Sequence, residues 1–397
     1  MLRTLLLLLG GLLTACAVAP METEPVAAQT AATGQSIRLT VSGPDHLVYS
    51  AATGRCDNMD LPDAPLRPVR NINGEFIVFG SGIVNRLLRG PGLDSLRHDC
   101  AVAYRGRDTR NPAEFDSATW LISPWTPDGR TVYALAHNEF EAYRFGDMCQ
   151  ANPRSSCWWN SVLLLKSVDG GRTYRRAGPN PLVAAPAHPY RPDQKQPVGF
   201  FSPANIIYKD GAWYSLFGVG PDGPQRRGAC LFRSTNIADP ASWRAFDGRD
   251  FTLAETSPYQ AGRNPQPCAT VGPFIGPVRS VVRQAGTGLF IALMTRRNPA
   301  RPDQDEVVYT VSRDLIHWSD AQHLLEILMP DRKDCDTLYR YAYPSLVDPA
   351  SPSANYDTVG NTARLYMVRM GTSPKHCMRV ETDRSVVWRQ VTISAGG

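Results

Sequence analysis

Residues 167–174 read SVDGGRTY, and this short polar stretch follows an apolar run, SVLLLKS, at 161–167. Asp169 is followed by two glycines. That order is typical of a tight turn, in which the carboxylate accepts backbone N–H groups and glycine adopts angles that other residues resist. A calcium loop is the alternative, but calcium needs more oxygen ligands than this stretch supplies. We therefore interpret SVDGGRTY as a structural turn at the end of a strand.

Four looser relatives of this turn recur along the chain, spaced about 70 residues apart. They are LDSL (93–96), STNIADPASW (234–243), SRDLIHW (312–318) and TDRSVVW (382–388). Together with SVDGGRTY they give the anchor residues Asp94, Asp169, Asn236, Asp314 and Asp383. Five related stretches at a near-constant spacing indicate a repeat architecture.

A hairpin pattern precedes each anchor: an apolar strand, a turn with Gly or Asp-Gly, and a second apolar strand. These hairpins are predicted at 65–81, 117–137, 202–218, 276–295 and 343–369. Each repeat then continues through a third strand, the anchor turn and a fourth strand. Four antiparallel strands in each of five repeats predict an all-β fold, a five-bladed β-propeller. The strand-like RLTVSG (38–43) is expected to close the ring by joining the last blade.

The N-terminus, MLRTLLLLLGGLLTAC, has one early Arg, an apolar run and small residues before Cys16. This is typical of a secretory signal, and its core is too short to span a membrane. Leu13–Cys16 resembles the bacterial lipobox, so we predict lipidation at Cys16; an ordinary signal peptide with an incidental Cys is the alternative. The predicted organisation is a lipoprotein signal peptide (1–16), a flexible tether (17–37) and a propeller domain (38–397). The protein is then expected in the bacterial cell envelope, held to the membrane by its lipid.

Eight cysteines remain after Cys16, at positions 56, 100, 149, 157, 230, 268, 335 and 377. An even number in an exported chain predicts disulfides, and pairing of neighbours in sequence order is the simplest choice. No CxxC spacing of a zinc site occurs, so no metal or other cofactor is predicted. The net charge of +5 is small for 397 residues and no dense basic run occurs, which argues against nucleic acid as a partner.

Chemistry is expected on the face opposite the anchor turns, where the inner strands begin and the second strands end. Three carboxylates fall there by strand register: Asp63 in LPDAPLRP, Asp116 in EFDSATW and Glu139 in ALAHNEF. Their structural alternatives are a turn Asp, a strand cap and a solvated loop carboxylate. We predict that Asp63 and Glu139 face a shared, partly aromatic pocket, in which burial raises the pKa of Glu139.

Further polar side chains are expected at the same mouth and are candidates for substrate binding. They are His137, Asn138, Asn205, Arg279, Arg340 and Tyr343. The two arginines suit hydroxyl groups or a carboxylate, although salt bridges between blades are the commoner use of such residues.

The repeat and its turns resemble two groups of propeller enzymes. SVDGGRTY is similar to the Asp-box of sialidases, S-x-D-x-G-x-T-W, with Tyr174 in place of Trp. SRDLIHW is similar to a form found in five-bladed glycoside hydrolases of families 43, 32 and 62 and related arabinan-degrading propellers. Sialidases have six blades and an arginine triad, and no sixth repeat is visible in this chain.

The resemblance to the five-bladed enzymes implies a base Asp in blade one, an orienting Asp in blade two and an acid Glu. By position, Asp63 is similar to the base and Asp116 to the orienting residue. Family 43 takes its Glu from blade three, where this chain offers Ser202 and Asn205, so Glu139 of blade two would have to substitute.

The function expected is therefore an exported glycoside hydrolase that acts on a polysaccharide or oligosaccharide by carboxylate acid/base catalysis. A non-catalytic propeller that binds carbohydrate or protein is the alternative, because propellers occur both as enzymes and as binding proteins. A sialidase-like exo-glycosidase is the third choice.

Overall fold

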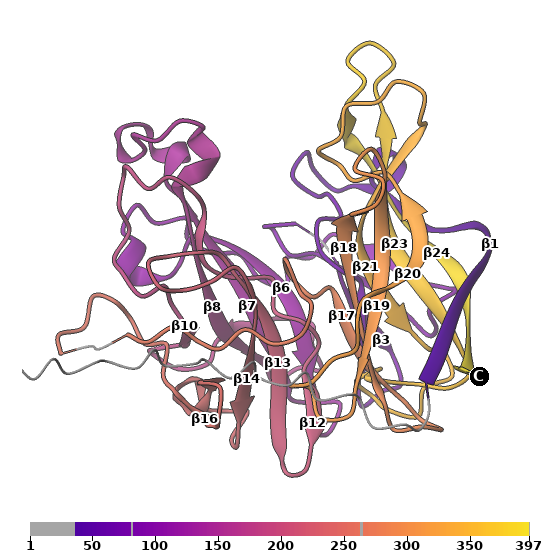
Figure 1. Cartoon of the computed structure of the whole chain (residues 1–397), viewed down its shortest axis with the longest axis horizontal. Helices are drawn as coiled ribbons and strands as arrows, with labels where there is room; N and C mark the ends of the chain where they lie inside the picture. Colours follow the sequence, from indigo (N-terminus) through magenta and orange to yellow (C-terminus); the bar gives the residue numbers. More distant parts are fainter. Residues whose placement is uncertain (1–35, 81, 263–264, 397) are drawn as a thin grey trace, which may run out of the picture. The chain divides into compact units, whose positions relative to one another are not determined.

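Antiparallel β-strands, joined mostly as hairpins, build the chain (Figure 1). The computed structural model describes residues 36–80, 82–262 and 265–396. The five predicted hairpins all form, as the pairs β2–β3, β6–β7, β12–β13, β17–β18 and β21–β23. No helix in the described ranges is long and apolar enough to cross a membrane.

The described strands fall into five consecutive groups. The first group holds β2 (Arg67–Arg70), β3 (Phe76–Phe79), β4 (Leu87–Gly90) and β5 (Arg97–Asp99). The second holds β6 (Ala118–Trp125), β7 (Val132–Glu141), β8 (Trp158–Ser167), β9 (Arg175–Arg176) and β10 (Leu182–Ala184). The third holds β11 (Val198–Phe201), β12 (Ile207–Lys209), β13 (Ala212–Val219), β14 (Gly228–Ser234), β15 (Arg244–Phe246) and β16 (Phe251–Leu253).

The fourth and fifth groups continue the same pattern. The fourth holds β17 (Ser280–Gln284), β18 (Phe290–Arg297), β19 (Asp305–Ser312) and β20 (Gln322–Ile327), with the short β22 (Thr358–Val359) beside β17. The fifth holds β21 (Tyr339–Val347), β23 (Thr362–Thr372), β24 (Arg379–Gly396) and β1 (Ser36–Ser50). Short helices lie between strands: α1 (Ala51–Gly54), η1 (Pro112–Glu114), η2 (Ala142–Met148), η3 (Arg154–Cys157) and η4 (Pro240–Ser242).

The first strand closes the last group. β1 pairs antiparallel with β24 over almost its whole length, from Ser36 opposite Gly396 to Ser50 opposite Ser385. The sequence prediction that residues 38–43 join the last blade is confirmed. Because the N-terminal strand completes a sheet built by the C-terminus, the two ends of the domain hold each other in place.

Five hydrophobic cores lie between successive groups of strands, including one between the fifth group and the first. The alternation of side chains along a strand explains how one strand serves two cores. On β8, Leu163 and Leu165 pack toward the first group, whereas Val162 and Leu164 pack toward the third. The prediction of an all-β propeller is confirmed, and this grouping supports its number of blades; β8 and β11 pair, which joins the second and third groups into one sheet.

The inner strands meet at one buried arginine. Arg67 of β2 is 2% exposed, and it donates to Ile122 O (3.2 Å) and Ser123 Oγ (2.7 Å) of β6. It also donates to Pro203 O and Arg279 O, both at 2.7 Å, on the chain that leads into the third and fourth groups. Segments of the first four groups therefore meet at Arg67, which places this residue at the axis of the propeller.

The turn at 167–174 has the hydrogen bonds that the sequence predicts. Asp169 Oδ1 accepts the backbone N–H groups of Arg172 and Thr173 at 3.0 Å, and Gly170 and Gly171 have φ angles of 74° and 86°. The side chain of Tyr174 packs into the core between the first and second groups. The turn follows the last residue of β8, at the far end from Trp158 and about 30 Å from it for a strand of this length.

Two of the five predicted anchors do not form such a turn. Asp94 lies in the β4–β5 turn, but its carboxylate pairs with Arg364 of β23 at 2.6 Å. Asp383 lies inside the long strand β24, near its beginning rather than its end. Local sequence resemblance was misleading there, because pairing with β1 and β23 holds the segment extended.

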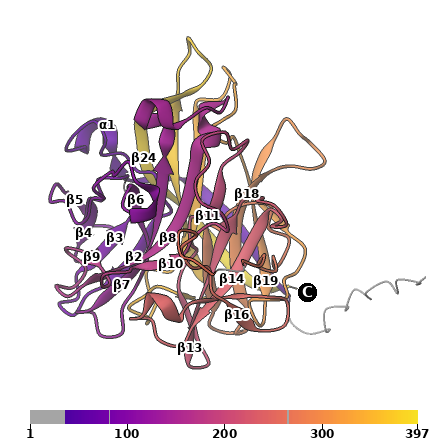
Figure 2. The same ribbon diagram turned by 90° about the vertical axis from the view of Figure 1, so that its left-hand side faces the viewer.

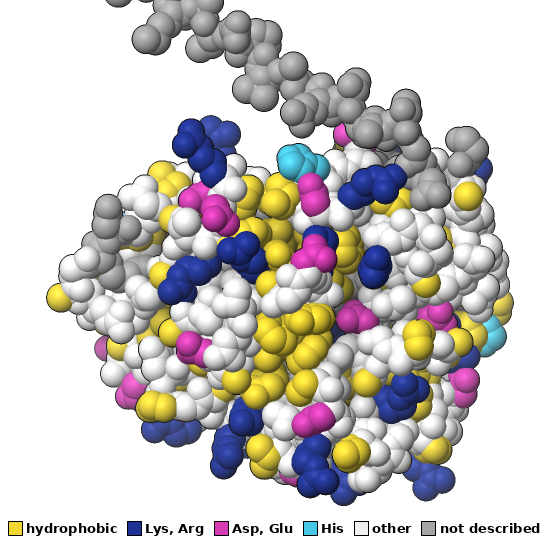
Figure 3. All heavy atoms as spheres, turned by 90° about the horizontal axis from the view of Figure 1, so that it is seen from below, with side chains coloured by type: hydrophobic (Ala, Val, Ile, Leu, Met, Phe, Trp, Pro, Cys, Tyr) yellow, Lys and Arg dark blue, Asp and Glu magenta, His cyan; other side chains and the backbone are white. Residues whose placement is uncertain are grey.

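The face with these turns carries exposed hydrophobic side chains. Ile72, Val168 and Tyr208, each in or beside a turn, are 56%, 54% and 51% exposed. Figure 3 views the domain from below and shows hydrophobic side chains in the middle of that face, with charged side chains around them.

Four disulfides link the cysteines in sequence order, as predicted: Cys56–Cys100, Cys149–Cys157, Cys230–Cys268 and Cys335–Cys377. The disulfides close loops of 44, 8, 38 and 42 residues, in that order. Cys16, with the predicted signal peptide and most of the predicted tether, lies outside the described residues.

Candidate active site

A cavity of about 250 Å³ opens on the axis, at the end of the strands away from the 167–174 turn. Segments at the inner strands of all five groups contribute to its wall. Figure 2 shows β8 of the second group and β11 of the third, which pair with each other. Its lining residues are Asp63, Ala64, Pro65, Trp120, Ile122, His137, Glu139, Glu141, Trp158, Phe201, Ser202, Pro277, Arg279 and Tyr343. The structure thus brings together Asp63, His137, Glu139, Arg279 and Tyr343 among the side chains proposed from the sequence.

The strand β7 supplies three polar side chains to this cavity. His137, Glu139 and Glu141 are spaced by two residues, so the alternation of a strand places them on one face. Asn138 points the other way, is 2% exposed, and lies 3.5 Å from Thr119 Oγ1. The substrate-binding role expected for Asn138 therefore has no support, whereas Glu141, which the sequence analysis passed over, lines the cavity.

The surroundings of Glu139 favour its protonated form. Burial is the largest effect and raises the pKa of Glu139 well above its usual value, and the charges of Glu141 and Asp63 raise it further. The Glu139 carboxyl also hydrogen-bonds to that of Glu141, which requires a proton on one of them. Glu141 accepts from Tyr143 Oη at 2.8 Å and pairs with Arg144 at 3.3 Å, and both contacts favour the charged form of Glu141 and hence a proton on Glu139.

His137 presents an unprotonated ring nitrogen to Glu139. Asn160 sets the tautomer: its Nδ2 donates to Val198 O (3.0 Å), so its Oδ1 accepts from His137 Nε2 (3.2 Å). Burial lowers the pKa of His137 to about 3, so the ring is neutral and Nδ1 has no proton. His137 Nδ1 lies 3.2 Å from Glu139 Oε1, a contact that is favourable when Glu139 carries the proton.

Asp63 is the second carboxyl group of the cavity, and its side chain is 30% exposed. It forms an ion pair with Arg384 of β24 and accepts a hydrogen bond from Tyr343 Oη at 3.2 Å. Burial raises the pKa of Asp63, while the charge of Arg384 and the hydrogen bonds from Arg384 and Tyr343 act in the opposite direction. Asp63 and Glu139 thus face one cavity in unlike environments, one beside a cation and the other beside further carboxyls.

Prolines shape the wall of the cavity. Ser202 and Tyr343 each precede a proline and have left-handed φ angles of 39° and 57°. Proline cannot donate to a strand ladder, so the inner strand is interrupted there, and β21 shifts register between Ala342 and Ser345. Such backbone angles are costly for residues other than glycine, and they cluster where a site fixes a side chain.

Aromatic rings make up much of the remaining wall, as the sequence predicts for this pocket. The rings of Trp120 and Phe201 have centroids 6.1 and 5.9 Å from that of His137, and Trp158 lies beside Tyr143. Aromatic faces with a few convergent polar groups are typical of a small-molecule site.

Two residues expected at the site are used elsewhere in the fold. Asp116 is buried and pairs with Arg107 at 2.6 Å and Arg176 at 3.4 Å, outside the cavity lining. Asn205 Oδ1 accepts the backbone N–H of Val281 at 3.0 Å, which ties the third group to the fourth. Both side chains thus have structural partners that sequence position did not reveal.

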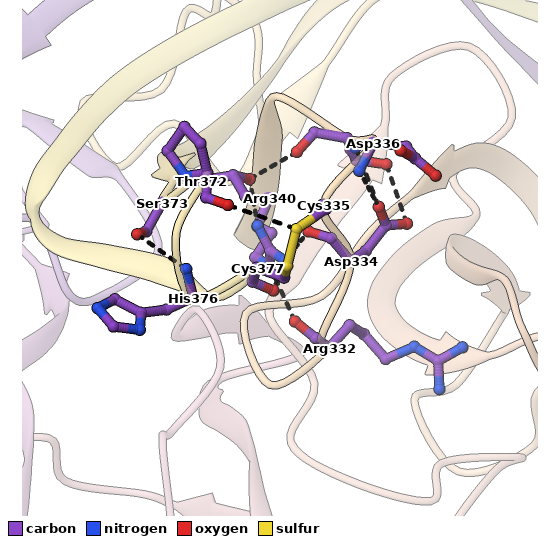
Figure 4. Close-up of a disulfide and its surroundings, with 11 residues drawn as sticks. Arg332, Asp334, Cys335, Asp336, Arg340, Thr372, Ser373, His376 and Cys377 are labelled. Atoms are coloured by element: carbon purple, nitrogen blue, oxygen red, sulfur yellow. Dashed lines mark hydrogen bonds between the residues drawn. A yellow bond between two sulfur atoms is a disulfide. The ribbon is translucent and has the colours of Figure 1, made fainter.

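Arg340 also has a structural place, beside the Cys335–Cys377 disulfide (Figure 4). Its guanidinium is buried and donates to the backbone carbonyls of Arg332, Asp334 and Cys377 at 2.7 to 3.1 Å. With its donors occupied in this way, Arg340 braces a loop rather than lining the cavity. The substrate-binding role expected for it has no support in this arrangement.

The described residues contain one group of metal-type side chains within reach of one another, Cys56, Asp60 and His98. The sulfur of Cys56 is used in the disulfide with Cys100, and Asp60 pairs with His98 at 2.5 Å. None of these residues lines the axial cavity, and we assign no metal to them.

No protein-family model matches the chain, and no curated protein matches it in sequence. Solved structures of similar arrangement include an α-L-arabinanase of Cellvibrio cellulosa in complex with arabinohexaose (11% identity, 84% of this chain and 92% of the other, TM-score 0.47). Another is a family 117 glycoside hydrolase of Zobellia galactanivorans (11% identity, 90% of this chain and 90% of the other, TM-score 0.47). A third is a xylan β-1,4-xylosidase of Bacillus halodurans (10% identity, 85% of this chain and 54% of the other, TM-score 0.44). This chain therefore spans about half of the xylosidase. These likenesses are too low to carry an argument, so the fold rests on the strand pairing and the site on its own geometry.

Proposed function

We propose that the protein is a glycoside hydrolase whose reaction takes place in the axial cavity. The observation that carries the proposal is a pair of carboxyl groups in unlike environments: burial and neighbouring carboxyls raise the pKa of Glu139, whereas Asp63 lies beside the cation Arg384. Two titratable groups whose environments favour different protonation states are the arrangement that acid/base cleavage of a glycosidic bond requires.

In the proposed reaction, Glu139 protonates the leaving glycosidic oxygen and Asp63 accepts a proton from the attacking water. The charge of Glu141 and its hydrogen bond favour a proton on Glu139. Asp116, which was expected to orient the base, lies outside the cavity lining and has no part in this reaction. His137 and Asn160 hold Glu139 in position from the other side. Trp120, Trp158 and Phe201 offer apolar faces to the sugar and exclude water.

A second candidate function is a propeller that binds sugar without cleaving it. One observation favours it: Asp63 is engaged by Arg384, and an ion pair makes a carboxylate a weaker base. The same cavity and the same aromatic residues would then serve recognition alone.

We also propose that the protein is exported and anchored by a lipid on Cys16 in the bacterial cell envelope. The four disulfides support an oxidising compartment, because such bonds are rare in the cytosol. Mass spectrometry of the mature N-terminus tests this: an acylated Cys16 supports the anchor, and a mature protein that begins at another residue contradicts it.

The test of the enzyme proposal is hydrolysis of a panel of polysaccharides and oligosaccharides by the full chain, compared with Asp63→Asn. We expect release of sugar from one class of glycan, and a rate about 10²–10⁴-fold lower in the variant. Asp94→Asn is the matched control, since Asp94 lies on the surface at 70% side-chain exposure. Binding of a glycan without cleavage by the wild type would favour the second candidate.

A further inference from the structure

Arg279 is a cation without a carboxylate partner in the wall of the cavity. Its backbone is fixed, because Arg279 N–H donates to Leu293 O (2.8 Å) and Arg279 O accepts from Arg67. Its side chain donates to Ser202 Oγ at 3.2 Å and lies with its guanidinium carbon 5.0 Å from the centroid of the Tyr343 ring. Among the described residues, Arg279 forms no salt bridge, and its other donors are left for whatever occupies the cavity.

A second arginine, Arg67, lies close to Arg279 and donates to Arg279 O at 2.7 Å. Arg67 donates to backbone carbonyls and Ser123, and it too has no carboxylate partner in the described part of the chain. Burial and the charge of Arg279 lower the pKa of Arg67 to about 9, which leaves it charged at neutral pH. Burial likewise lowers the pKa of Arg279. One guanidinium, that of Arg279, therefore lies in the cavity wall, and a second, that of Arg67, lies close to it.

The carboxylates of the cavity do not cancel this charge. Asp63 is within electrostatic reach of Arg279, but its ion pair is with Arg384. Glu141 is paired with Arg144, and the raised pKa of Glu139 favours its neutral form. A cation in a partly enclosed site is poorly stabilised unless a charged or polar partner reaches it.

The size of the cavity limits what that partner can be. About 250 Å³ is the room of roughly eight water molecules, which suits one sugar ring rather than a longer segment. An anionic group on that ring would meet Arg279 in the planar, two-point geometry by which arginine binds carboxylates. A neutral sugar leaves the charge of Arg279 unpaired.

We propose that the cavity takes a sugar unit that bears a carboxylate, a uronic acid, and that Arg279 binds this group. The inference rests on the proposed function, and it names the substrate class of that site. Arg279 then selects the substrate, Arg67 adds positive charge close to it, and Asp63 and Glu139 are left to act on the bond that breaks.

Binding of matched sugars to the full chain tests this inference. Calorimetry with galacturonic acid against galactose, and glucuronic acid against glucose, each up to about 10 mM, compares ligands that differ at one carbon. We expect an acidic sugar to bind at least about tenfold more tightly than its neutral partner, and less tightly as salt rises. Equal affinity, tighter binding of the neutral sugar, or no binding of either acid overturns the inference.

Three variants locate the effect. Arg279→Met should abolish the preference for the acid, and Arg279→Lys should retain part of it. Arg364→Met, at an arginine that pairs with Asp94 away from the cavity, should leave the preference unchanged. A preference that survives in a folded Arg279→Met protein overturns the assignment to Arg279; if that variant does not fold, the wild-type comparison still decides.

The failures of the two proposals are distinguishable. Binding of a uronic acid without hydrolysis of any uronate-containing oligosaccharide supports the inference and contradicts the enzyme. Hydrolysis of neutral oligosaccharides in preference to acidic ones supports the enzyme and contradicts the inference.

Discussion

Asp169 and Asp63 lie at opposite ends of the strands, and they show how one residue type can have two different roles. The carboxylate oxygens of Asp169 accept hydrogen bonds within its own turn, from Ser167, Arg172 and Thr173. Burial acts to raise the pKa of Asp169, but these hydrogen bonds outweigh it and lower the pKa. Asp63 has its partners 280 and 321 residues away in sequence, and burial raises its pKa despite them.

The two aspartates differ in whether the carboxylate stabilises the fold or is placed to act on a ligand. A carboxylate satisfied by its own turn stabilises the fold and has no capacity left for a ligand. A carboxylate held at the axis by distant strands faces a cavity, and burial there raises its pKa. The following variants break or sharpen this distinction.

The largest effect is expected from exchanging the two aspartates for asparagine. Asp63→Asn should lower the rate of glycan cleavage by about 10²–10⁴-fold, because the base is lost. Asp169→Asn should leave the rate unchanged and lower the free energy of unfolding by about 1 kcal/mol, the worth of a local hydrogen bond. Parallel rate and urea-unfolding measurements decide, and a rate loss in Asp169→Asn equal to that in Asp63→Asn would contradict the distinction.

A smaller effect is expected from Arg384→Gln, which leaves Asp63 without its cation. The side chain of Arg384 is 9% exposed, and removing one partner of a mostly buried pair costs on the order of 3 kcal/mol. The pKa of Asp63 should also rise, because Arg384 is the main cause that lowers it. The lower limb of the pH–rate profile should therefore move to higher pH; an unmoved limb would show that Asp63 is not the base.

The pH dependence of stability should reveal the lowered pKa of the buried His137. In the folded protein its pKa is lowered to about 3, whereas in the unfolded chain it is about 6.5. Between these values the unfolded chain binds a proton that the folded protein does not, so acidification through this window favours unfolding. In His137→Gln the melting temperature should fall less steeply from about pH 6.5 to 4. His376→Gln, at an exposed position outside the cavity, is the control, and equal slopes in all three proteins would contradict a buried neutral His137.

The smallest effect is expected at Asp94. Its pair with Arg364 resembles the pair of Asp63 with Arg384 in chemistry, but the Asp94 side chain is 70% exposed. Asp94→Asn should change the free energy of unfolding by about 0–1 kcal/mol, as is usual for surface pairs. A loss as large as that in Arg384→Gln would mean that burial does not set the strength of these pairs.

Much of the fold could be predicted from local patterns in the sequence. The hairpins, the closing strand β1, the order of the disulfides and the turn at Asp169 all depend on residues close in sequence or on alternation along a strand. The anchor at Asp383 failed because long-range pairing with β1 keeps that segment extended. Local resemblance does not contain that information.

The site was predictable where strand register determines it and not where distant partners do. Register placed Asp63 and Glu139 at the axis, and the alternation of β7 could have added Glu141 and removed Asn138. The prolines after Ser202 and Tyr343 were a further signal for interrupted inner strands. By contrast, nothing near Asp116 in sequence indicates Arg176 as its partner, and nothing near Asp63 indicates Arg384.

The role of Glu139 as a protonated acid is the central claim, and the leaving group tests it most directly. Glu139→Gln should lose about 10²–10⁴-fold in rate on the natural glycosidic linkage. On the matching dinitrophenyl glycoside, whose leaving group departs without protonation, the variant should keep most of the wild-type rate. An unchanged rate on the natural linkage, or an equal loss on both substrates, would contradict the account.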